Sequence, residues 1–191
     1  MMTDRDNNII QFIDKFDGIT INQCAKLFFN NANYGKDLAR KRLKKLSDNN
    51  VLKYEDDWVT NQRVYFIKKK PSSHSIMLLN FYSELIETGV EIIEFQKEYK
   101  IDNICRPDGF IVFQYHNKGK MAFIEIDMSH KTDLSKYEKL YDTELFQREY
   151  NTFPEVIIIS STQNYETKGH NFSIKILDYS LNQLKDKILY F

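Results

Sequence analysis

Apolar residues recur at helical spacing three times before residue 47, and β-rich runs follow them. The periodicity predicts three short helices, over about 9–16, 21–29 and 36–46. Gly18 marks the end of the first helix, and Thr20 stands where its side chain can cap the second. Two short runs, 51–54 and 64–67, are then typical of strands, with an acidic polar turn between them.

The second half of the chain alternates between the helical and the strand pattern. It predicts the order helix, strand, strand, strand, helix, strand, over 76–86, 90–95, 108–114, 120–128, 134–150 and 156–159. The last of these strands is a continuous apolar run, which is typical of a strand buried on both faces. We therefore expect a right-handed parallel crossover between the last two strands of this set. A further strand over 172–177 and a short helix over 181–190 complete the prediction.

A change in composition separates the two patterns. Residues 68–75 contain three lysines, a proline and three serines, which is typical of irregular chain. We therefore expect an α+β protein with two domains, 1–70 and 71–191. The apolar fraction of 42% and the charged fraction of 28% are those of a globular chain rather than a disordered one.

The net charge of zero conceals an asymmetry between these domains. Residues 1–70 carry 14 Lys and Arg against nine Asp and Glu, a balance of +5, and the remainder of the chain carries the opposite balance. A basic domain favours an anionic partner for itself alone. Three helices followed by a hairpin are the layout of a winged helix-turn-helix, whose third helix enters the major groove of duplex DNA.

The third helix supplies most of the residues predicted to contact DNA. Its polar faces carry lysine and arginine, which neutralise phosphates and release counterions. The DNA-binding prediction comprises Asn33, Tyr34, Lys36, Arg40, Lys41, Lys44, Lys45 and Arg63. An ordinary solvated helix face is the alternative. The hairpin turn weakens the case for a wing on DNA, because it carries Glu55, Asp56 and Asp57. Trp58 in that turn is interpreted as a packing residue.

Three acids of the second domain are predicted to converge. Alternation along the strand over 120–128 places Glu125 and Asp127 on one face, at the end of an otherwise apolar strand. Two carboxylates in that position are costly to bury. Asp108 opens the adjacent antiparallel strand, so it can lie opposite that end. A hard cation is the expected ligand of such a cluster.

This element order, with Asp108 and Glu125 on neighbouring strands, resembles the PD-(D/E)xK nucleases of the restriction-endonuclease-like fold. The resemblance implies an αβββαβ mixed sheet, Mg²⁺ or Mn²⁺ held by the two acids, and a lysine two residues after the second acid. Asp127 occupies that lysine position here. A carboxylate repels hydroxide where an ammonium would stabilise it, which favours a non-catalytic domain. Lys131 and Lys139 are alternative sources of the lysine.

The chain over roughly residues 8–160 also resembles the replication-relaxation family of plasmid, phage and conjugative-element proteins. The resemblance rests on Leu27-Phe28-Phe29, on Arg42-Leu43-Lys44-Lys45-Leu46, on Arg106-Pro107-Asp108-Gly109, and on Glu125-Ile126-Asp127 before a helix. The family implies an accessory DNA-binding role in the replication, relaxation or transfer of a mobile element.

We therefore expect a sequence- or structure-specific double-stranded DNA-binding accessory protein whose second domain is non-catalytic and binds no cofactor. The alternative is a metal-dependent endonuclease, with Asp108, Glu125 and Asp127 as catalytic and metal-binding residues. Glu84 is a further candidate metal ligand. A transcriptional repressor with a ligand-sensing second domain is a third hypothesis. The expected protein partners are replication proteins, a relaxase or a second copy of the chain.

The remaining sequence features bear on the compartment. Cys24 and Cys105 are isolated thiols that form neither a disulfide pattern nor a zinc-ligand pattern. The first residues lack the apolar core of a signal peptide, and no apolar run is long enough to span a membrane. We therefore expect a cytoplasmic protein without membrane association.

Overall fold

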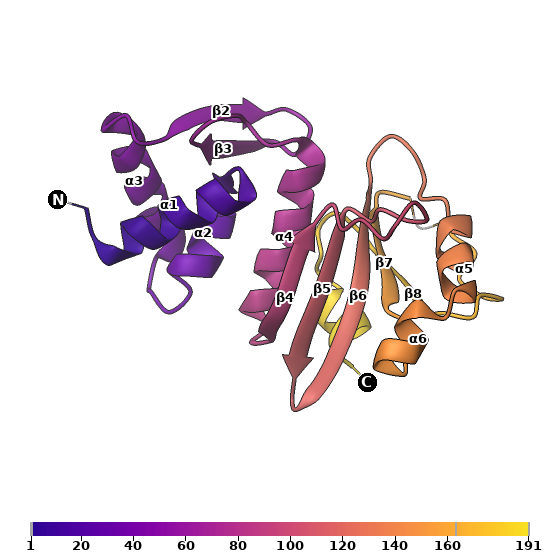
Figure 1. The fold of residues 1–191 in the computed structure, drawn as a ribbon. Helices are drawn as coiled ribbons and strands as arrows, with labels where there is room; N and C mark the ends of the chain where they lie inside the picture. Colours follow the sequence, from indigo (N-terminus) through magenta and orange to yellow (C-terminus); the bar gives the residue numbers. More distant parts are fainter. Residues whose placement is uncertain (1, 163, 191) are drawn as a thin grey trace. The chain divides into compact units, whose positions relative to one another are not determined.

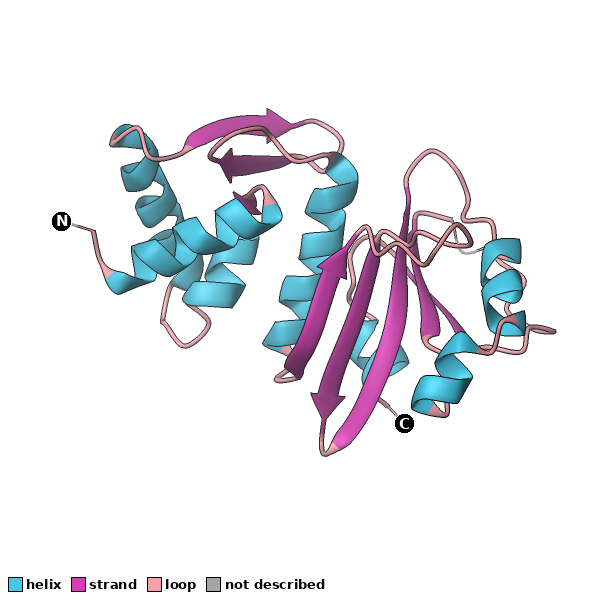
Figure 2. Cartoon of the chain, viewed as in Figure 1, coloured by secondary structure: helices cyan, strands magenta, loops and turns pink. Residues whose placement is uncertain are grey.

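The computed structural model describes residues 2–162 and 164–190, and the chain divides into two compact units. The first unit extends to Glu87, and the second begins at Thr88. Figure 1 follows the chain through both units, and Figure 2 shows which segments are helix, strand and loop. The expected α+β class is confirmed. Within the described residues, we find no helix of the length and apolar character needed to cross a membrane.

The first unit combines helices with a small antiparallel sheet (Figure 1). The helices are α1 (Asp4–Phe16), α2 (Ile21–Phe28), α3 (Gly35–Asp48) and α4 (Ser73–Glu87). The strands are β1 (Ile19–Thr20), β2 (Lys53–Asp57) and β3 (Gln62–Phe66), in the order β1-β3-β2. The three predicted helices and the hairpin are therefore confirmed. Strand β1 was not predicted, because two residues are too few to show a period.

Capping boxes begin α1 and α2. The Thr3 hydroxyl accepts a hydrogen bond from the Asp6 N–H (3.4 Å), and the Asp6 carboxylate accepts one from the Thr3 N–H (2.6 Å). Thr20 and Gln23 repeat the exchange in α2, at 3.2 and 2.9 Å, which confirms Thr20 as the N-cap. The fully buried Asp6 carboxylate also binds the Arg42 guanidinium. The first cap therefore fastens α1 to α3.

Helix α4 packs with the first unit. The Gln23 side-chain amide of α2 donates to the Asn80 side chain (2.8 Å), and Lys26 pairs with Glu84. The expected domain boundary followed the composition of the linker and lay between residues 70 and 71. The structure moves the boundary to Glu87, because the contacts of α2 hold α4 in the first unit.

The second unit is a mixed sheet with short helices. The strands are β4 (Glu91–Lys97), β5 (Gly109–Tyr115), β6 (Lys118–Asp127), β7 (Glu155–Ser160) and β8 (Ile174–Leu177), in that order across the sheet. The first three strands pair antiparallel, and β6, β7 and β8 pair parallel. The helices are α5 (Ser135–Asp142), α6 (Leu145–Tyr150) and the π-helix η1 (Lys185–Leu189). The predicted order of elements and the parallel pairing of β6 with β7 are confirmed.

The helix predicted over 134–150 is interrupted. Helix α5 ends at Asp142, and Glu144 adopts a left-handed backbone with φ of 55° before α6 begins. The Thr143 hydroxyl donates to the Leu140 carbonyl (2.6 Å) and closes the last turn of α5. Phe146 beyond the break is still buried. The apolar spacing therefore continues across the interruption, and periodicity does not reveal it.

Helices α5 and α6 cover one face of the second sheet. The cluster on this face includes Phe110, Phe123, Val156 and Ile158 from the strands and Tyr137, Leu140 and Phe146 from the helices. Glu125 and Asp127 alternate with Ile124 and Ile126 along β6, so they share the helix-covered face with Phe123. The prediction that the two acids share one face of this strand is therefore confirmed.

Lysines tie the C-terminal segment of the second unit to the sheet. The Lys120 ammonium donates to the Ile188 carbonyl of η1 (2.9 Å) and pairs with the buried Glu155 carboxylate (3.0 Å). The Lys187 ammonium donates to the Ile176 carbonyl of β8 (2.8 Å). Contacts from β6 and β8 therefore hold η1 in place.

Gly35 at the start of α3 has no room for a side chain. A Cβ atom at this position would lie 2.6 Å from the Phe29 carbonyl oxygen, which belongs to the backbone and yields only at a cost. We expect Gly35→Ala to lower the free energy of unfolding by about 1–3 kcal/mol, the usual cost of overpacking. Urea denaturation followed by circular dichroism measures the change. Gly119→Ala is the matched control, because nothing lies within 4 Å of its Cβ position. Equal losses in both variants would contradict the close approach.

Candidate functional site

Helix α3 presents one face to the core of the first unit and the others to solvent. Ala39, Leu43 and Leu46 are buried with residues of α1 and α2. Their spacing of four and three residues makes a single stripe along the helix. Leu38 is also apolar, but it is 39% exposed. Position 38 precedes the stripe by one residue and is therefore rotated out of the core.

The lysines of α3 are exposed, and we find no ion pair for them in the part of the chain that the structure describes. They are Lys36, Lys41, Lys44 and Lys45. Arg40, by contrast, binds Asp37 within the same turn (2.6 Å). Arg42 binds the buried Asp6 and belongs to the fold. The lysines are therefore the positive charges of this helix that a ligand would meet.

The start of α3 is also accessible. Tyr34 precedes the helix with a left-handed backbone, and its side chain is 82% exposed. Asn33 beside it is exposed as well. Both residues belong to the DNA-binding prediction, and both are exposed at the start of the helix.

A hollow of about 450 Å³ lies between α3 and the β2–β3 hairpin. Arg40 and Lys44 line it from the helix, and Tyr54 and Arg63 line it from the hairpin. The Arg63 guanidinium binds the Asp56 carboxylate through two nitrogens (2.9 and 3.1 Å) and lies 4.7 Å from the centre of the Tyr54 ring. These hydrogen bonds lower the pKa of Asp56. Helix and hairpin therefore share one surface, with the arginine held in place on it.

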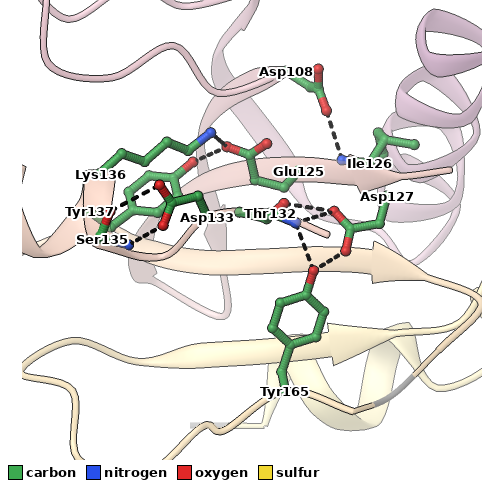
Figure 3. Close-up of polar contacts among 10 residues, drawn as sticks. All are labelled: Asp108, Glu125, Ile126, Asp127, Thr132, Asp133, Ser135, Lys136, Tyr137 and Tyr165. Atoms are coloured by element: carbon green, nitrogen blue, oxygen red, sulfur yellow. Dashed lines mark hydrogen bonds and ion pairs between the residues drawn. The ribbon is translucent and has the colours of Figure 1, made fainter. Parts of the chain in front are cut away.

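Asp108 and Glu125 converge near the end of β6 (Figure 3). The Asp108 carboxylate accepts a hydrogen bond from the Ile126 N–H (2.7 Å), which confirms its placement opposite that strand end. Glu125 is buried, and burial raises the pKa of its carboxyl. The nearby negative charge of Asp108 acts in the same direction. The two acids are therefore close enough to influence each other.

Two residues from the first turn of α5 contact Glu125. The Lys136 ammonium lies 2.6 Å from Oε1, and the buried Tyr137 hydroxyl donates to the same oxygen (Figure 3). Both contacts counteract the effect of burial on the pKa of Glu125. Sequence reasoning missed both residues as neighbours of this acid. Position 136 lies four residues before the buried Leu140, so the helical stripe was the signal that could have placed Lys136 beside the sheet.

Asp127 takes part in a different set of contacts. Its Oδ1 accepts hydrogen bonds from the Thr132 N–H (3.1 Å) and hydroxyl (2.7 Å), and its Oδ2 accepts one from the Tyr165 hydroxyl. Burial and the Asp127 carboxylate raise the pKa of Tyr165, so Tyr165 remains a donor. The Tyr179 hydroxyl donates to the Asp127 carbonyl. Asp127 therefore fastens the loop after β6, and in Figure 3 its carboxylate points toward Tyr165 rather than toward Lys136.

The predicted cluster of acids is not assembled among the described residues. They contain no group of three His, Cys, Asp or Glu side chains that could hold a metal ion. Glu84 belongs to the first unit, where it pairs with Lys26, and Asp127 is engaged in its own loop. Asp108 and Glu125 remain as two carboxylates of the kind that hard cations prefer.

Lys131 and Lys139 were the alternative sources of the lysine in the nuclease pattern, and the structure shows neither of them paired with Glu125. The Lys131 ammonium donates to the Asn164 carbonyl (2.8 Å) and lies 5.4 Å from the centre of the Tyr165 ring. Lys139 is exposed on α5. Lys136 instead provides the positive charge beside Glu125.

Comparisons with models of protein families, with curated proteins and with solved structures found no match to this chain.

Glu125→Gln is expected to raise the free energy of unfolding at neutral pH. Burial raises the pKa of Glu125, so the ionised carboxylate is the form that the fold disfavours. The wild-type protein loses stability as the pH rises through the folded pKa of Glu125, whereas the amide does not titrate. The difference in the free energy of unfolding between the variant and the wild type should therefore disappear as the pH falls toward the pKa of the unfolded state, about 4.3. Urea denaturation at acidic and neutral pH measures it. A variant less stable at neutral pH would show that the pair with Lys136 outweighs the cost of burial.

Asp127→Asn is the comparison for that experiment. We expect this variant to lose about 1–3 kcal/mol, because the Thr132 and Tyr165 donors would face an amide in place of a carboxylate. A gain in stability for Glu125→Gln and a loss for Asp127→Asn would show that Glu125 is retained at a cost to stability, whereas Asp127 stabilises the fold.

Proposed function

We propose that this chain is a double-stranded DNA-binding protein that docks α3 of its first unit on the duplex. The observation that carries the proposal is the set of exposed lysines on α3, beside a hairpin that lines the same hollow. An α-helix fits the major groove of B-DNA, and lysines on it neutralise phosphates with release of counterions. The order of three helices and a hairpin supports a winged helix-turn-helix as the docking geometry.

The distribution of acids on α3 favours a ligand over a merely solvated surface. A helix face that serves solubility usually mixes charges of both signs at spacings of three or four residues. The acids of α3 are Asp37 and Asp48, and they lie at its two ends. Asp37 is occupied with Arg40. The middle of the helix is therefore basic without interruption by acids, as a phosphate-binding surface requires.

The biological setting of this activity is proposed from the resemblance described above. The similarity to the replication-relaxation family supports an accessory role in the replication, relaxation or transfer of a plasmid, phage or conjugative element. In that role the first unit would recognise the DNA, and the second would serve as a platform for a replication protein or a relaxase.

Removal of lysines from α3 tests the DNA-binding proposal. Fluorescence anisotropy of a labelled duplex of mixed sequence is measured across a range of salt concentrations. If the protein contacts about four to six phosphates, the logarithm of the association constant should fall with the logarithm of the salt concentration at a slope near −4 to −5. The triple variant K41A/K44A/K45A should bind more weakly and flatten that slope by about 3, since each lost phosphate contact removes roughly one.

The matched control removes the same charge from the second unit. Lys100, Lys139 and Lys185 are exposed there, and K100A/K139A/K185A should leave the slope unchanged. Equal effects of the two triple variants would mean that net charge alone attracts DNA. An unchanged slope in the α3 variant would make its lysines a solvated face, and either result would overturn the proposal.

One observation favours a second function, the hydrolysis of a DNA phosphodiester. Lys136 lies 2.6 Å from Glu125, so a positive charge stands beside this acid although position 127 is not a lysine. The order of three strands, helix and strand, with Asp108 and Glu125 together, supports a PD-(D/E)xK-like site whose lysine comes from α5. The earlier preference for a non-catalytic domain depended on Asp127, which takes part in other contacts.

Asp108 and Glu125 are the residues that would hold a divalent cation in such a site. The contacts of Glu125 with Lys136 and Tyr137 converge on Oε1. Magnesium or manganese would polarise the phosphate and lower the pKa of a bound water. The Lys136 ammonium would stabilise the negative charge that develops on the attacking oxygen, and Tyr137 would orient Glu125.

Nicking of supercoiled plasmid in the presence of Mn²⁺ tests this second function. Asp108→Asn and Lys136→Ala should each reduce the rate by about 100-fold or more, as the loss of one electrostatic contact to a transition state commonly does. Lys139→Ala is the control, because its side chain is exposed on the same helix. A wild-type protein that binds DNA without nicking it would leave the second unit as a non-catalytic platform.

A further inference from the structure

Trp58, the single tryptophan of the chain, lies in the turn of the β2–β3 hairpin. Its side chain is 88% exposed, and that of Val59 beside it is 69% exposed. The interpretation of Trp58 as a packing residue is therefore wrong. One exposed apolar residue is ordinary in a folded protein. Two adjacent ones in a single turn form a small apolar patch that a ligand could cover.

Asp57 holds the turn that carries these two side chains. Its buried carboxylate accepts hydrogen bonds from the Thr60 N–H (3.0 Å) and hydroxyl (2.7 Å), and from the Ser73 hydroxyl (3.0 Å). The Lys70 ammonium lies 3.1 Å away. Burial opposes ionisation, but these hydrogen bonds hold the pKa of Asp57 below its usual value. The turn is therefore fixed before any partner arrives, and little entropy is lost when its tip is inserted into a binding site.

The hairpin is less acidic toward solvent than its sequence indicates. Asp56 pairs with Arg63, and Asp57 pairs with Lys70. The three acids of the hairpin, Glu55, Asp56 and Asp57, are balanced in number by Lys53, Arg63 and Lys70. The repulsion of phosphates expected from the acidic turn is therefore largely removed within the protein itself.

The base of the turn lies beside the DNA-binding helix. A hollow of about 160 Å³ is lined by Lys36 of α3 and by Asn61 and Gln62, which directly follow the tip. Further along the hairpin, Tyr54 faces the hollow that Lys44 also lines. A duplex seated on the lysines of α3 would therefore run close to the tip of the hairpin.

We propose that Trp58, supported by Val59, is an apolar wedge that stacks against bases of the duplex bound by α3. The inference rests on the proposed DNA-binding function. Proteins that read a groove commonly insert apolar side chains between base steps, and stacking of an aromatic ring on a base is worth about 1–3 kcal/mol. A protein partner fits less well, because a stable interface needs about 800 Å² from each side and the tip offers two side chains.

The emission of Trp58 reports directly on this contact, because no other tryptophan contributes to it. The wild-type protein is titrated with a mixed-sequence duplex of about 20 base pairs, and acrylamide quenching of Trp58 is measured alongside the anisotropy of the labelled DNA. Free protein should be strongly quenched. Bound protein should be protected, with the same midpoint as the anisotropy curve. Binding seen by anisotropy while Trp58 stays fully quenchable would overturn the wedge and leave the DNA-binding function intact.

Affinity measurements on variants provide a second readout. Trp58→Ala should raise the dissociation constant for the duplex roughly 5- to 150-fold, which corresponds to the loss of a stacking energy of about 1–3 kcal/mol. The salt slope should not change, because stacking releases no counterions. Trp58→Phe should recover most of the affinity. Tyr150→Ala is the control, since Tyr150 is an aromatic residue exposed in the second unit.

The remaining outcomes separate the wedge from the function on which it rests. An unaffected Trp58→Ala variant alongside a weakened α3 variant would refute the wedge alone. Absence of any duplex binding by the wild-type protein would refute both. Protection of Trp58 that grows with protein concentration in the absence of DNA would assign the tip to a contact between copies of the chain, and would also refute the wedge.

Discussion

An ionised carboxylate is tolerated inside a protein only when cations or hydrogen-bond donors surround it, and this requirement shapes both units. Removing one partner so that the other is left as an unpaired buried charge usually costs several kcal/mol. The acids buried among the described residues are Asp6, Asp57, Glu125, Asp127 and Glu155. Each is bound by a group from another segment of its unit. Asp6 joins α1 to α3, Asp57 joins the hairpin to the start of α4, and Glu155 joins β7 to β6.

The same requirement sorts the basic residues into two groups. Arg42 and Lys70 pair with the buried acids Asp6 and Asp57 of the first unit and so join its segments. Among the described residues, the lysines of α3 have no ion pair, so their charge is available to an anionic ligand. In the second unit, Asp127 is bound by hydroxyl and amide donors and serves the fold, whereas Glu125 has a lysine beside it. A carboxylate next to an ammonium at the end of a strand is an arrangement suited to chemistry.

Hydrophobic periodicity predicts the order of elements in both units. The spacing of the apolar residues shows which positions of a helix or a strand are buried, and every element buries one face or more. Periodicity places Glu125 and Asp127 on one face of β6 for the same reason. It fails where a non-local contact decides the outcome. Gln23 and Lys26 bind α4, so the helix belongs to the unit before it, although the linker lies ahead of it in the sequence.

The residues of the candidate sites also divide into those that the sequence predicts and those that it does not. Asp108 and Glu125 are predictable because strand register brings them together, and the α3 lysines because they lie opposite a buried stripe. Lys136 was missed because the nuclease pattern directs attention to position 127, while the helix start that delivers the ammonium depends on the length of the preceding loop. Trp58 was misjudged because an aromatic residue is usually buried, and only the backbone of the turn shows that it has no core to enter.

The anchoring of the C-terminal segment to β6 also imposes an order on folding during synthesis. The first unit is contiguous up to Glu87, so its core can form while later residues are still being added. The second sheet cannot be completed in that way, because β7 obtains its outer neighbour from β8 and Lys120 binds η1. Until those segments emerge, β7 offers an unpaired and largely apolar edge to other chains. A nascent chain that has released β7 from the ribosome while β8 is still inside it would therefore carry a finished first unit joined to an aggregation-prone sheet.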